Sequence, residues 1–509
     1  MRHILLFCFY IFTTHMTFAS RAYYVNNNGD DTQPGTRNKP FKTIQKLNSI
    51  KLQPGSKVYL AGNQVFTGPL ILTADESSTT SKPITITSYG GGKATIDGGK
   101  GQAILVNSNY TILSHLNAKG AGRNDGNTTD GILLANTQGC TIEDVTIDGF
   151  QKAGLEVNNC TDVKVLKATA RNNGSAGISI SGTHETSKNI VIKDCLADNN
   201  PGDPTNLTNH SGNGILVGGS DSVLIDHCVA TNNGWDMPRL GNGPVGIWGY
   251  ESSHLTIQYC ISYNNKTHAG ASDGGGFDFD GGVTNSVIQY CLSYNNEGSG
   301  YGLFQYEGAS HWANNTMRYC ISVNDGTKTT GAAGILVWSS TVDSVDLHSC
   351  MIYNNLIINQ QAPAVSFHQL SKNEGFLFAN NIIMAKDSLV NGPSSGERFL
   401  GNIWWGIDGG IPKFREFDNL ADWSAATGQE TLKDKLVGLQ ADPLLRGPLT
   451  TTLTDPYQLD TLSAYQLQDS SPAIDRGLNL KALFDVILPD QDFFGKPNNT
   501  KPYPGIAGH

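Results

Sequence analysis

Residues 246–265 read GIWGYESSHLTIQYCISYNN, and residues 276–296 read GFDFDGGVTNSVIQYCLSYNN. Both stretches open with a glycine, continue as a short run that alternates apolar residues with others, and close on a cysteine followed by an Asn-Asn pair. Short alternating runs are typical of β-strands, because successive side chains point to opposite faces of the strand. Two such copies in succession indicate a repeated structural unit.

A small residue opens a run of this kind nine times along the chain. The intervals range from 23 residues (Gly131 to Gly154) to 37 residues (Gly177 to Gly214), as in solenoid proteins. Each unit holds a few short strands and no long amphipathic helix, so the units stack as parallel strands about 4.8 Å apart. The sequence therefore predicts an all-β fold, a right-handed parallel β-helix. The nine markers are Gly131, Gly154, Gly177, Gly214, Gly246, Gly276, Gly302, Gly334 and Ala364.

A second row of residues, formed by the cysteines and the Asn pairs, keeps the same register over six turns. Asparagine tolerates left-handed turn conformations and can bond the amide of the next turn. Cysteines on stacked turns have parallel side chains that do not converge, so we expect buried free thiols rather than disulfides or a zinc site. The row contains Cys195, Cys228, Cys260, Cys291, Cys320 and Cys350, and Cys140 and Cys160 precede it.

The two ends of the chain differ from the coil between them. Arg2 and His3 precede an apolar run and a small residue at Ala19, a pattern that predicts a signal peptide over residues 1–19 and a secreted or periplasmic protein. We expect an N-terminal cap with a helix over residues 20–57, the β-helix over residues 58–384, and an irregular C-terminal capping region over residues 385–509. Caps cover strand edges that would otherwise invite aggregation.

The net charge of −10 argues against nucleic acid and anionic membranes as partners, because both attract basic surfaces. No segment of the mature chain is apolar enough to anchor it in a bilayer. We expect a soluble exported protein, and we also expect it to be a monomer.

The chain resembles a known superfamily over nearly the whole mature chain, in its Asn-rich coils and at both ends. The opening Tyr23-Tyr24-Val25-Asn26, the helix start Pro40-Phe41-Lys42-Thr43-Ile44 and the closing Ser471-Pro472-Ala473-Ile474-Asp475 carry the resemblance. They resemble exported right-handed β-helix proteins of the pectate-lyase-like superfamily. The resemblance implies this fold and a polysaccharide or oligosaccharide substrate. That superfamily includes lyases, hydrolases and epimerases, so the resemblance does not select a reaction.

Two aspartates stand out on the outward face of the coil. In each strand after a marker, the second and fourth residues point outward. This places Asp278 and Asp280 on one face, with their Cα atoms about 6.6 Å apart. Paired carboxyl groups cleave glycosidic bonds, and a close pair raises the pKa of one partner as a general acid requires. We expect both to face solvent and to be catalytic.

The neighbouring turns and loops carry further candidates. Sugars stack their apolar faces on aromatic rings, so outward aromatic residues beside the aspartates predict substrate binding. The loops inserted beside these turns add groups that bind hydroxyls or transfer protons. The binding candidates are Trp248, Tyr250, Phe304, Tyr306, Trp338, His368, Arg239, Lys266 and His268, and Asp273 and Glu307 are reserve catalytic carboxyls.

Three function classes fit these residues. The favoured one is a glycoside hydrolase without a cofactor. In the second, a polysaccharide lyase, Asp273, Asp278 and Asp280 hold calcium while Arg239, Lys266 or His268 removes a proton from a uronate. The third is a non-catalytic glycan-binding protein. The hydrolase is favoured because the outward face offers aromatic and acidic groups and few cations.

Overall fold

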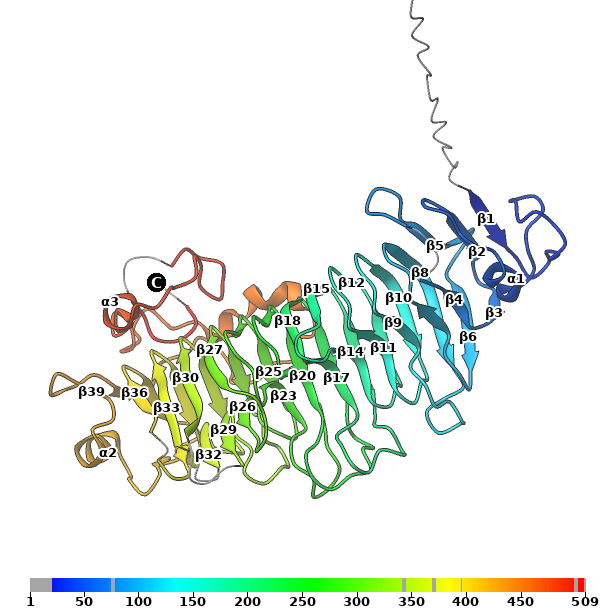
Figure 1. The fold of residues 1–509 in the computed structure, drawn as a ribbon. Helices are drawn as coiled ribbons and strands as arrows, with labels where there is room; N and C mark the ends of the chain where they lie inside the picture. Colours follow the sequence, from blue (N-terminus) through cyan, green and yellow to red (C-terminus); the bar gives the residue numbers. More distant parts are fainter. Residues whose placement is uncertain are drawn as a thin grey trace, which may run out of the picture.

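The computed structural model describes residues 21–74, 78–340, 345–368, 372–394, 396–498 and 502–507. The predicted signal peptide lies outside these residues. The described chain is a long coil of short parallel strands, which confirms the predicted β-helix (Figure 1). Its α-helices are the short α1 (Ile44–Asn48), α2 (Leu420–Thr427) and α3 (Leu480–Phe484). None of the described helices is long and apolar enough to cross a membrane.

One wall of the coil is a 13-stranded sheet in which every neighbouring pair is parallel. This sheet carries the strands that follow the marker residues, so it is the wall on which the candidate site was predicted. Its strands are β4 (Leu70–Leu72), β7 (Ile104–Val106), β9 (Ile132–Ala135), β11 (Ala153–Asn158), β14 (Ala176–Ser181), β17 (Asn213–Gly218), β20 (Val245–Tyr250), β23 (Gly275–Phe279), β26 (Tyr301–Gln305), β29 (Ile335–Ser339), β32 (Val365–His368), β35 (Ser388–Asn391) and β38 (Lys413–Phe414).

The other walls form a 26-stranded sheet, also parallel. Its first half contains β1 (Ala22–Val25), β2 (Lys57–Ala61), β3 (Val65–Thr67), β5 (Ile84–Tyr89), β6 (Ala94–Gly99), β8 (Thr111–Gly120), β10 (Thr141–Asp148), β12 (Lys164–Leu166), β13 (Thr169–Arg171), β15 (Ser187–Lys193), β16 (Leu196–Asp198), β18 (Ser220–Asp226) and β19 (Val229–Thr231). The second half contains β21 (Thr256–Gln258), β22 (Ile261–Tyr263), β24 (Val287–Gln289), β25 (Leu292–Tyr294), β27 (Trp312–Arg318), β28 (Ile321–Val323), β30 (Val345–Tyr353), β31 (Leu356–Asn359), β33 (Lys372–Ala379), β34 (Ile382–Ala385), β36 (Arg398–Leu400), β37 (Ile403–Gly406) and β41 (Leu439–Gln440).

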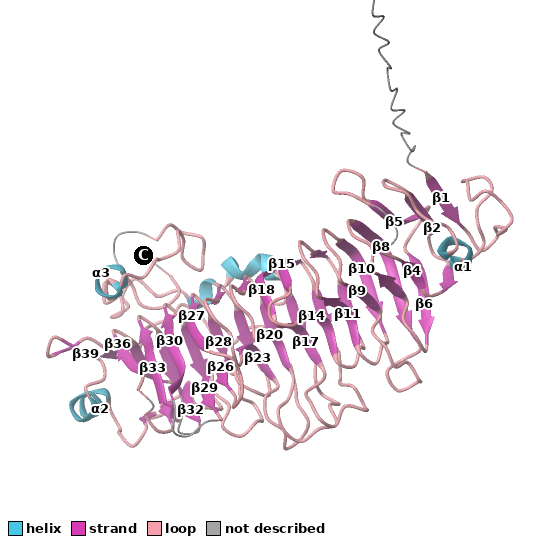
Figure 2. Cartoon of the chain, viewed as in Figure 1, coloured by secondary structure: helices cyan, strands magenta, loops and turns pink. Residues whose placement is uncertain are grey.

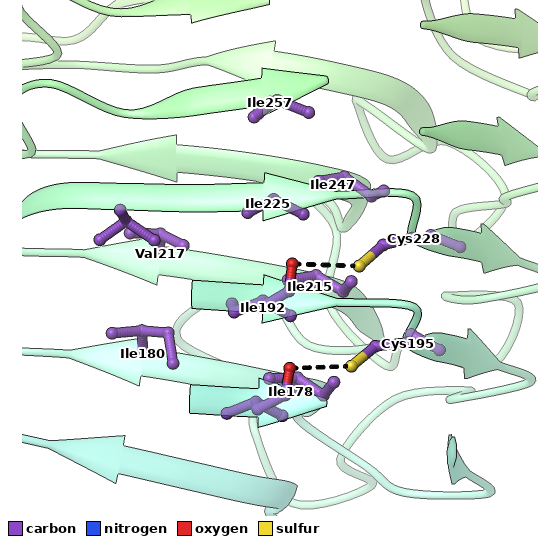
Figure 3. Close-up of a cluster of buried hydrophobic side chains, with 14 of the residues drawn as sticks. Ile178, Ile180, Ile192, Cys195, Ile215, Val217, Ile225, Cys228, Ile247 and Ile257 are labelled. Carbon is purple, nitrogen blue, oxygen red and sulfur yellow. Dashed lines mark hydrogen bonds between the residues drawn. The ribbon is translucent and has the colours of Figure 1, made fainter. Parts of the chain in front are cut away.

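The inside of the coil is filled by stacked aliphatic side chains and by the cysteine row. Figure 3 shows Cys195 and Cys228 pointing inward beside isoleucines of neighbouring turns. Their thiols donate weak hydrogen bonds to the carbonyl oxygens of Val165 and Ile192, both at 3.5 Å. All eight cysteines of the described chain are buried and free, which confirms the prediction of a thiol row.

The second asparagine of each pair forms a buried ladder along the coil. The side-chain amide of Asn200 donates a hydrogen bond to Asn233 Oδ1 (2.8 Å), and the side-chain amide of Asn233 donates in turn to Asn265 Oδ1 (2.9 Å). The ladder starts at Asn173, continues through Asn296 and ends on Asp325 Oδ1 (2.8 Å). A second run, Asn355, Asn381 and Asn402, ends on the buried carboxylate of Glu430. The first asparagine of each pair has positive φ, as expected (Asn232, 56°).

Both ends of the coil are covered. The buried residues Ile44 and Leu47 of α1 pack into the N-terminal opening, and α2 inserts Trp423 against Trp404 at the other end (Figure 1). Parallel pairing continues past the expected boundary at residue 384, which falls inside β34, to β37 and β38.

The antiparallel pair β39 (Thr431–Leu432) and β40 (Lys435–Leu436), the 3-10 helices η1 (Pro456–Thr461) and η2 (Ser463–Tyr465), and α3 follow in the C-terminal segment. This segment packs along the 26-stranded sheet, where Tyr457 stacks on His227 and Tyr290 donates to the carbonyl oxygen of Gln491. It therefore leaves the outer face of the 13-stranded sheet open. Figure 2 shows long loops gathered at the edge below β17 and β20.

Candidate active site

A cleft of about 890 Å³ lies on the outer face of the 13-stranded sheet, over β17, β20, β23, β26, β29 and β32. The sequence placed the candidate residues on these strands and on the loops beside them. Most of them meet in this one cavity. The predicted residues that line it are Asp273, Asp278, Asp280, Trp248, Tyr250, Phe304, Tyr306, Trp338, His368 and Arg239.

The register of β26 differs from the prediction. Asp278 pairs with Gly302, so Gly302 lies in the outward row and Gly300 is the marker that aligns with Gly276. The outward pair of this turn is therefore Gly302 and Phe304, whereas Phe304 and Tyr306 were expected. Tyr306 lies beyond the end of β26 but still lines the cleft.

Two outward rows cross the floor of the cleft. In one row, Trp248, Asp278, Gly302 and Leu336 occupy successive strands. In the other row, Phe304 pairs with Trp338, and Trp338 pairs with His368. Asp280 directly follows β23, next to the end of β20. The carboxyl groups thus lie between aromatic residues of the neighbouring turns.

Asp278 is buried, with 3% of its surface exposed, so the expectation that it faces solvent was wrong. Burial is the main cause that raises its pKa well above the usual range, and the nearby carboxyl groups of Asp280 and Asp273 add to the effect. Its Oδ1 atom is buried without a hydrogen-bond partner among the described residues. The surroundings of Asp278 therefore disfavour the ionised form of its carboxyl group.

Asp280 and Asp273 are half-buried and more open to the cleft. Burial raises the pKa of Asp280 to about 7, although Oδ1 accepts a hydrogen bond from the Gly281 amide (2.8 Å). Burial also raises the pKa of Asp273 to about 6, and its Oδ2 accepts from the Gly243 amide (2.7 Å). The two groups consequently differ in their readiness to lose a proton.

Loops hold Asp273 in place. Its φ of 62° lies in the left-handed region, which is unusual for a residue with a side chain. The Thr329 hydroxyl, itself at the cleft wall, donates to the Asp273 carbonyl oxygen (3.0 Å). Insertions from three turns therefore fix the position of this carboxyl group, and the sequence placed Asp273 only in reserve.

Aromatic rings form the walls of the cleft. Trp248 is 3% exposed and Phe304 is 9% exposed, so each presents only part of its ring. The Trp248 indole donates to Asn213 Oδ1 (3.0 Å), and the Phe304 ring meets Trp338 edge-on at 6.1 Å. Fixed rings of this kind suit the flat faces of sugars.

His210 lines the cleft and was not among the predicted residues. Its ring meets Trp248 edge-on at 4.9 Å, and burial lowers its pKa to about 4. It lies in the loop of the 37-residue interval, the longest insertion, which was the available signal. His210 is therefore neutral near pH 7 and adds no positive charge to the cleft. Among the lining residues, Arg239 is the only Lys or Arg.

Three predicted residues lie outside the cleft lining. Glu307 and Lys266 are exposed, and the His268 ring contacts the carbonyl oxygen of Ala269 (2.8 Å). These residues were predicted because they lie near the acidic strand in the sequence. In the structure, their side chains are not among those that line the cleft.

The proposed calcium ligands do not fit a metal site. Within the described ranges, no three His, Cys, Asp or Glu side chains are grouped as a metal would require. The Asp278 carboxyl is covered, and Asp273 and Asp280 each accept from a backbone amide.

These features define a β-helix protein with an acidic, aromatic-walled cleft on one sheet. A family model described as "Pel9A-like, right handed beta helix region" matches residues 23–319, which is more than half of the chain. The protein belongs to this family, and the predicted resemblance to the pectate-lyase-like superfamily is confirmed. No curated protein sequence matches the chain.

Solved structures share the fold at low identity. A GH136 lacto-N-biosidase from Eubacterium ramulus, as its selenomethionine derivative, has a TM-score of 0.53 and 20% identity, over 73% of this chain and 68% of that chain. The native form of that protein has a TM-score of 0.52 and 17% identity, over 74% and 68%. Pectate lyase Pel9A has a TM-score of 0.47 and 14% identity, over 96% of both chains.

Proposed function

We propose that the protein is a glycoside hydrolase in which Asp280 is the general acid and Asp273 acts at the anomeric carbon. One observation carries this proposal: the carboxyl groups of Asp273 and Asp280 line the same cleft of about 890 Å³, whose walls are aromatic. Rings bind the apolar faces of sugars, and a carboxyl pair supplies the acid and its ionised partner.

The roles follow from the environments of the two groups. The Gly243 amide stabilises the charged form of Asp273, and the lower pKa of about 6 leaves it mostly ionised near pH 6.5. Asp280, with a pKa of about 7, is then mostly protonated. A general acid works best when its pKa lies near the working pH, a condition that Asp280 meets.

The reaction consumes one water molecule. Asp280 passes its proton to the glycosidic oxygen as the bond from that oxygen to the anomeric carbon breaks. The Asp273 carboxylate stabilises the positive charge that develops on the anomeric carbon. Water then supplies the hydroxyl group of the new reducing end and the proton that restores the carboxyl pair.

The lyase alternative has less support. Of its candidate bases, only Arg239 lines the cleft, and an arginine does not lose its proton at neutral pH. The three aspartates do not form the required metal site. A uronate would also bring a further negative charge beside Asp273 and Asp280.

The test is digestion of a panel of neutral and uronate-containing oligosaccharides and polysaccharides, with and without a chelator. We expect new reducing ends, no unsaturated product that absorbs in the near ultraviolet, and unchanged activity with chelator. An unsaturated product whose formation needs calcium would instead establish the lyase. Binding without any product, in a folded protein, would establish the non-catalytic class.

A further inference from the structure

Trp235 is a large side chain on the surface, outside the cleft. It lies in the loop of residues 232–244, between β19 and β20, and 47% of its surface is exposed. It is not among the residues that line the cleft, although Arg239 of the same loop is. Single exposed apolar residues are ordinary, but this ring is also fixed in position.

Two contacts hold the Trp235 ring. The indole N–H donates a hydrogen bond to Asn199 Oδ1 (2.8 Å). The Arg123 guanidinium lies over the ring, 5.8 Å from its centroid. Arg123 is fixed in turn, because it donates to the Gly202 carbonyl oxygen (3.0 Å) and pairs with Asp236. The ring therefore loses little freedom when a ligand binds, which favours affinity.

A row of planar polar side chains continues from the ring along the coil. Asn199 donates to Asn172 Oδ1 (2.6 Å), and Asn172 donates to Asp148 Oδ1 (3.1 Å). Arg171 closes the row with a bond to Asp148 Oδ2 (2.9 Å). These residues stand at the ends of β10, β13 and β16, which are paired neighbours. The row therefore crosses three successive turns of the coil.

The row keeps polar groups available to a ligand. A side-chain amide has two N–H groups and two oxygen lone pairs. In the hydrogen bonds of the described residues, Asn199 and Asn172 each use one N–H and one lone pair. Both side chains are half-buried, and that of Asp148 is 34% exposed. An open ring beside amides and a carboxylate matches a sugar, which presents an apolar face to the ring and hydroxyl groups to the polar side chains.

The charges on this surface favour a neutral glycan. Arg123 pairs with Asp236, and Arg171 pairs with Asp148. Asp198, at the end of β16, adds a further carboxylate beside the row. A uronate would therefore meet carboxylates whose neighbouring cations are already paired, whereas an uncharged sugar would meet no repulsion.

We propose that Trp235, Asn199, Asn172 and Asp148 form a second glycan-binding site, which holds a neutral polysaccharide chain outside the cleft. The loop of residues 232–244 carries both Trp235 and the cleft residue Arg239. A chain bound at Trp235 stays tethered to the protein, which raises the effective concentration of its other segments at the cleft. Binding at this second site does not depend on the reaction in the cleft.

The test is affinity gel electrophoresis of the mature chain in gels that contain galactomannan, xyloglucan or mixed-linkage glucan, with alginate as the charged probe. Every sample carries Asp280→Asn, so that turnover does not shorten the probe. The added substitutions are Trp235→Ala, Trp235→Phe and Trp338→Ala, the last of which weakens the cleft. Tyr457→Ala is the matched control, since Tyr457 is 58% exposed and belongs to neither site.

We expect at least one neutral polysaccharide to retard the protein. Trp235→Ala should weaken this binding at least about 10-fold, as the loss of an anchoring tryptophan does, and Trp235→Phe should weaken it less. The loss should also appear when Trp338→Ala is present, and Tyr457→Ala should change nothing. Hydroxyl-radical footprinting tests the site without a substitution at Trp235: the same polysaccharide should protect Trp235 from oxidation but leave Tyr457 reactive.

Three results would overturn the inference: equal binding with and without Trp235→Ala in chains that are folded by circular dichroism, tightest binding of alginate, or no retardation by any neutral polysaccharide. Self-association that Trp235→Ala abolishes would also overturn it, because a second copy of the chain would then cover the ring. Failure to hydrolyse any glycan would refute the proposed function alone, since binding at Trp235 needs no turnover.

Discussion

Replacing Asp280 with Asn should lower turnover by at least about 100-fold and at the same time stabilise the fold at neutral pH. The pKa of this carboxyl rises from 3.8 to about 7 on folding because the cleft buries it. The folded chain therefore binds more protons than the unfolded chain between these values. The stability that the neutral carboxyl contributes is fully present below about pH 4 and is lost as the pH rises to about 7.

The size of the effect follows from the shift. Each pKa unit corresponds to about 1.4 kcal/mol, so the full shift corresponds to about 4.5 kcal/mol above pH 7. Asp280 is only half-buried, and solvent screening reduces this cost to roughly 2–4 kcal/mol. An asparagine has no charge to bury and avoids this cost. Loss of an acid catalyst lowers turnover by about 10²- to 10⁴-fold.

The assay is thermal unfolding of the original protein and of Asp280→Asn at several pH values from 4 to 8, with turnover measured on the same samples. We expect equal melting temperatures at pH 4 and a gain of a few degrees for the variant at pH 8. The exposed residue Asp460, in η1, supplies the control: Asp460→Asn should show no gain. A variant that is no more stable at pH 8 would show that the cleft does not disfavour the Asp280 charge.

Four further outcomes are expected. The pH profile of kcat/KM should be bell-shaped, with a rising limb at about pH 6 from Asp273 and a falling limb at about pH 7 from Asp280. A profile that is flat from pH 5 to 8 would contradict these roles. Asp273→Asn should lower kcat by at least about 100-fold. Asn265→Ala should lower stability by about 2–4 kcal/mol in denaturant unfolding, because it orphans the Asn233 amide; no loss would contradict the ladder. Trp338→Ala should raise KM with little change in kcat, since the ring binds rather than reacts. Thiol titration of the unfolded mature chain should find its eight cysteines free, whereas the folded chain should react slowly; missing thiols would indicate disulfides.

The fold was predictable because each row repeats one chemistry on every turn. A cysteine in the core and an asparagine in a left-handed turn recur at positions that any reader of the sequence can align. These rows hold register through local hydrogen bonds, so no long-range information was needed to find them. The candidate strand with Asp278 and Asp280 followed from the same alignment.

The register at Gly302 was not predictable from alternation alone. Gly300 and Gly302 flank Tyr301, and a marker at either glycine leaves the alternation of inward and outward residues unchanged, with Tyr301 facing inward. The structure buries it, stacks it on Phe277 at 5.2 Å, and satisfies its hydroxyl with the carbonyl oxygens of Cys291 and Ile321. A polar group can face inward when the backbone supplies partners, and the sequence does not display those partners.

The burial of Asp278 was also not predictable from the sequence. Whether an outward aspartate is solvated depends on how the rings of the turns above and below lean, and Phe304 leans over Gly302. The contribution of His210 depends on the path of a long insertion across the sheet. Loop paths have no repeat to reveal them, which is why Glu307, Lys266 and His268 were misplaced.

The asparagine ladder has a direction, and that direction constrains how this protein can grow. Each amide receives from one turn and gives to the next, so a duplicated turn that carries its own asparagine would leave no group unpaired between Asn173 and Asn296. Asp325 has no N–H to pass on, and it ends the run beneath the turn that leads to β29. Turns can therefore be added by simple duplication between Asn173 and Asn200, before the first strand of the cleft, β17. Asp325 lies between β28 and β29, so this acceptor-only residue ends the ladder within the turns that carry the cleft.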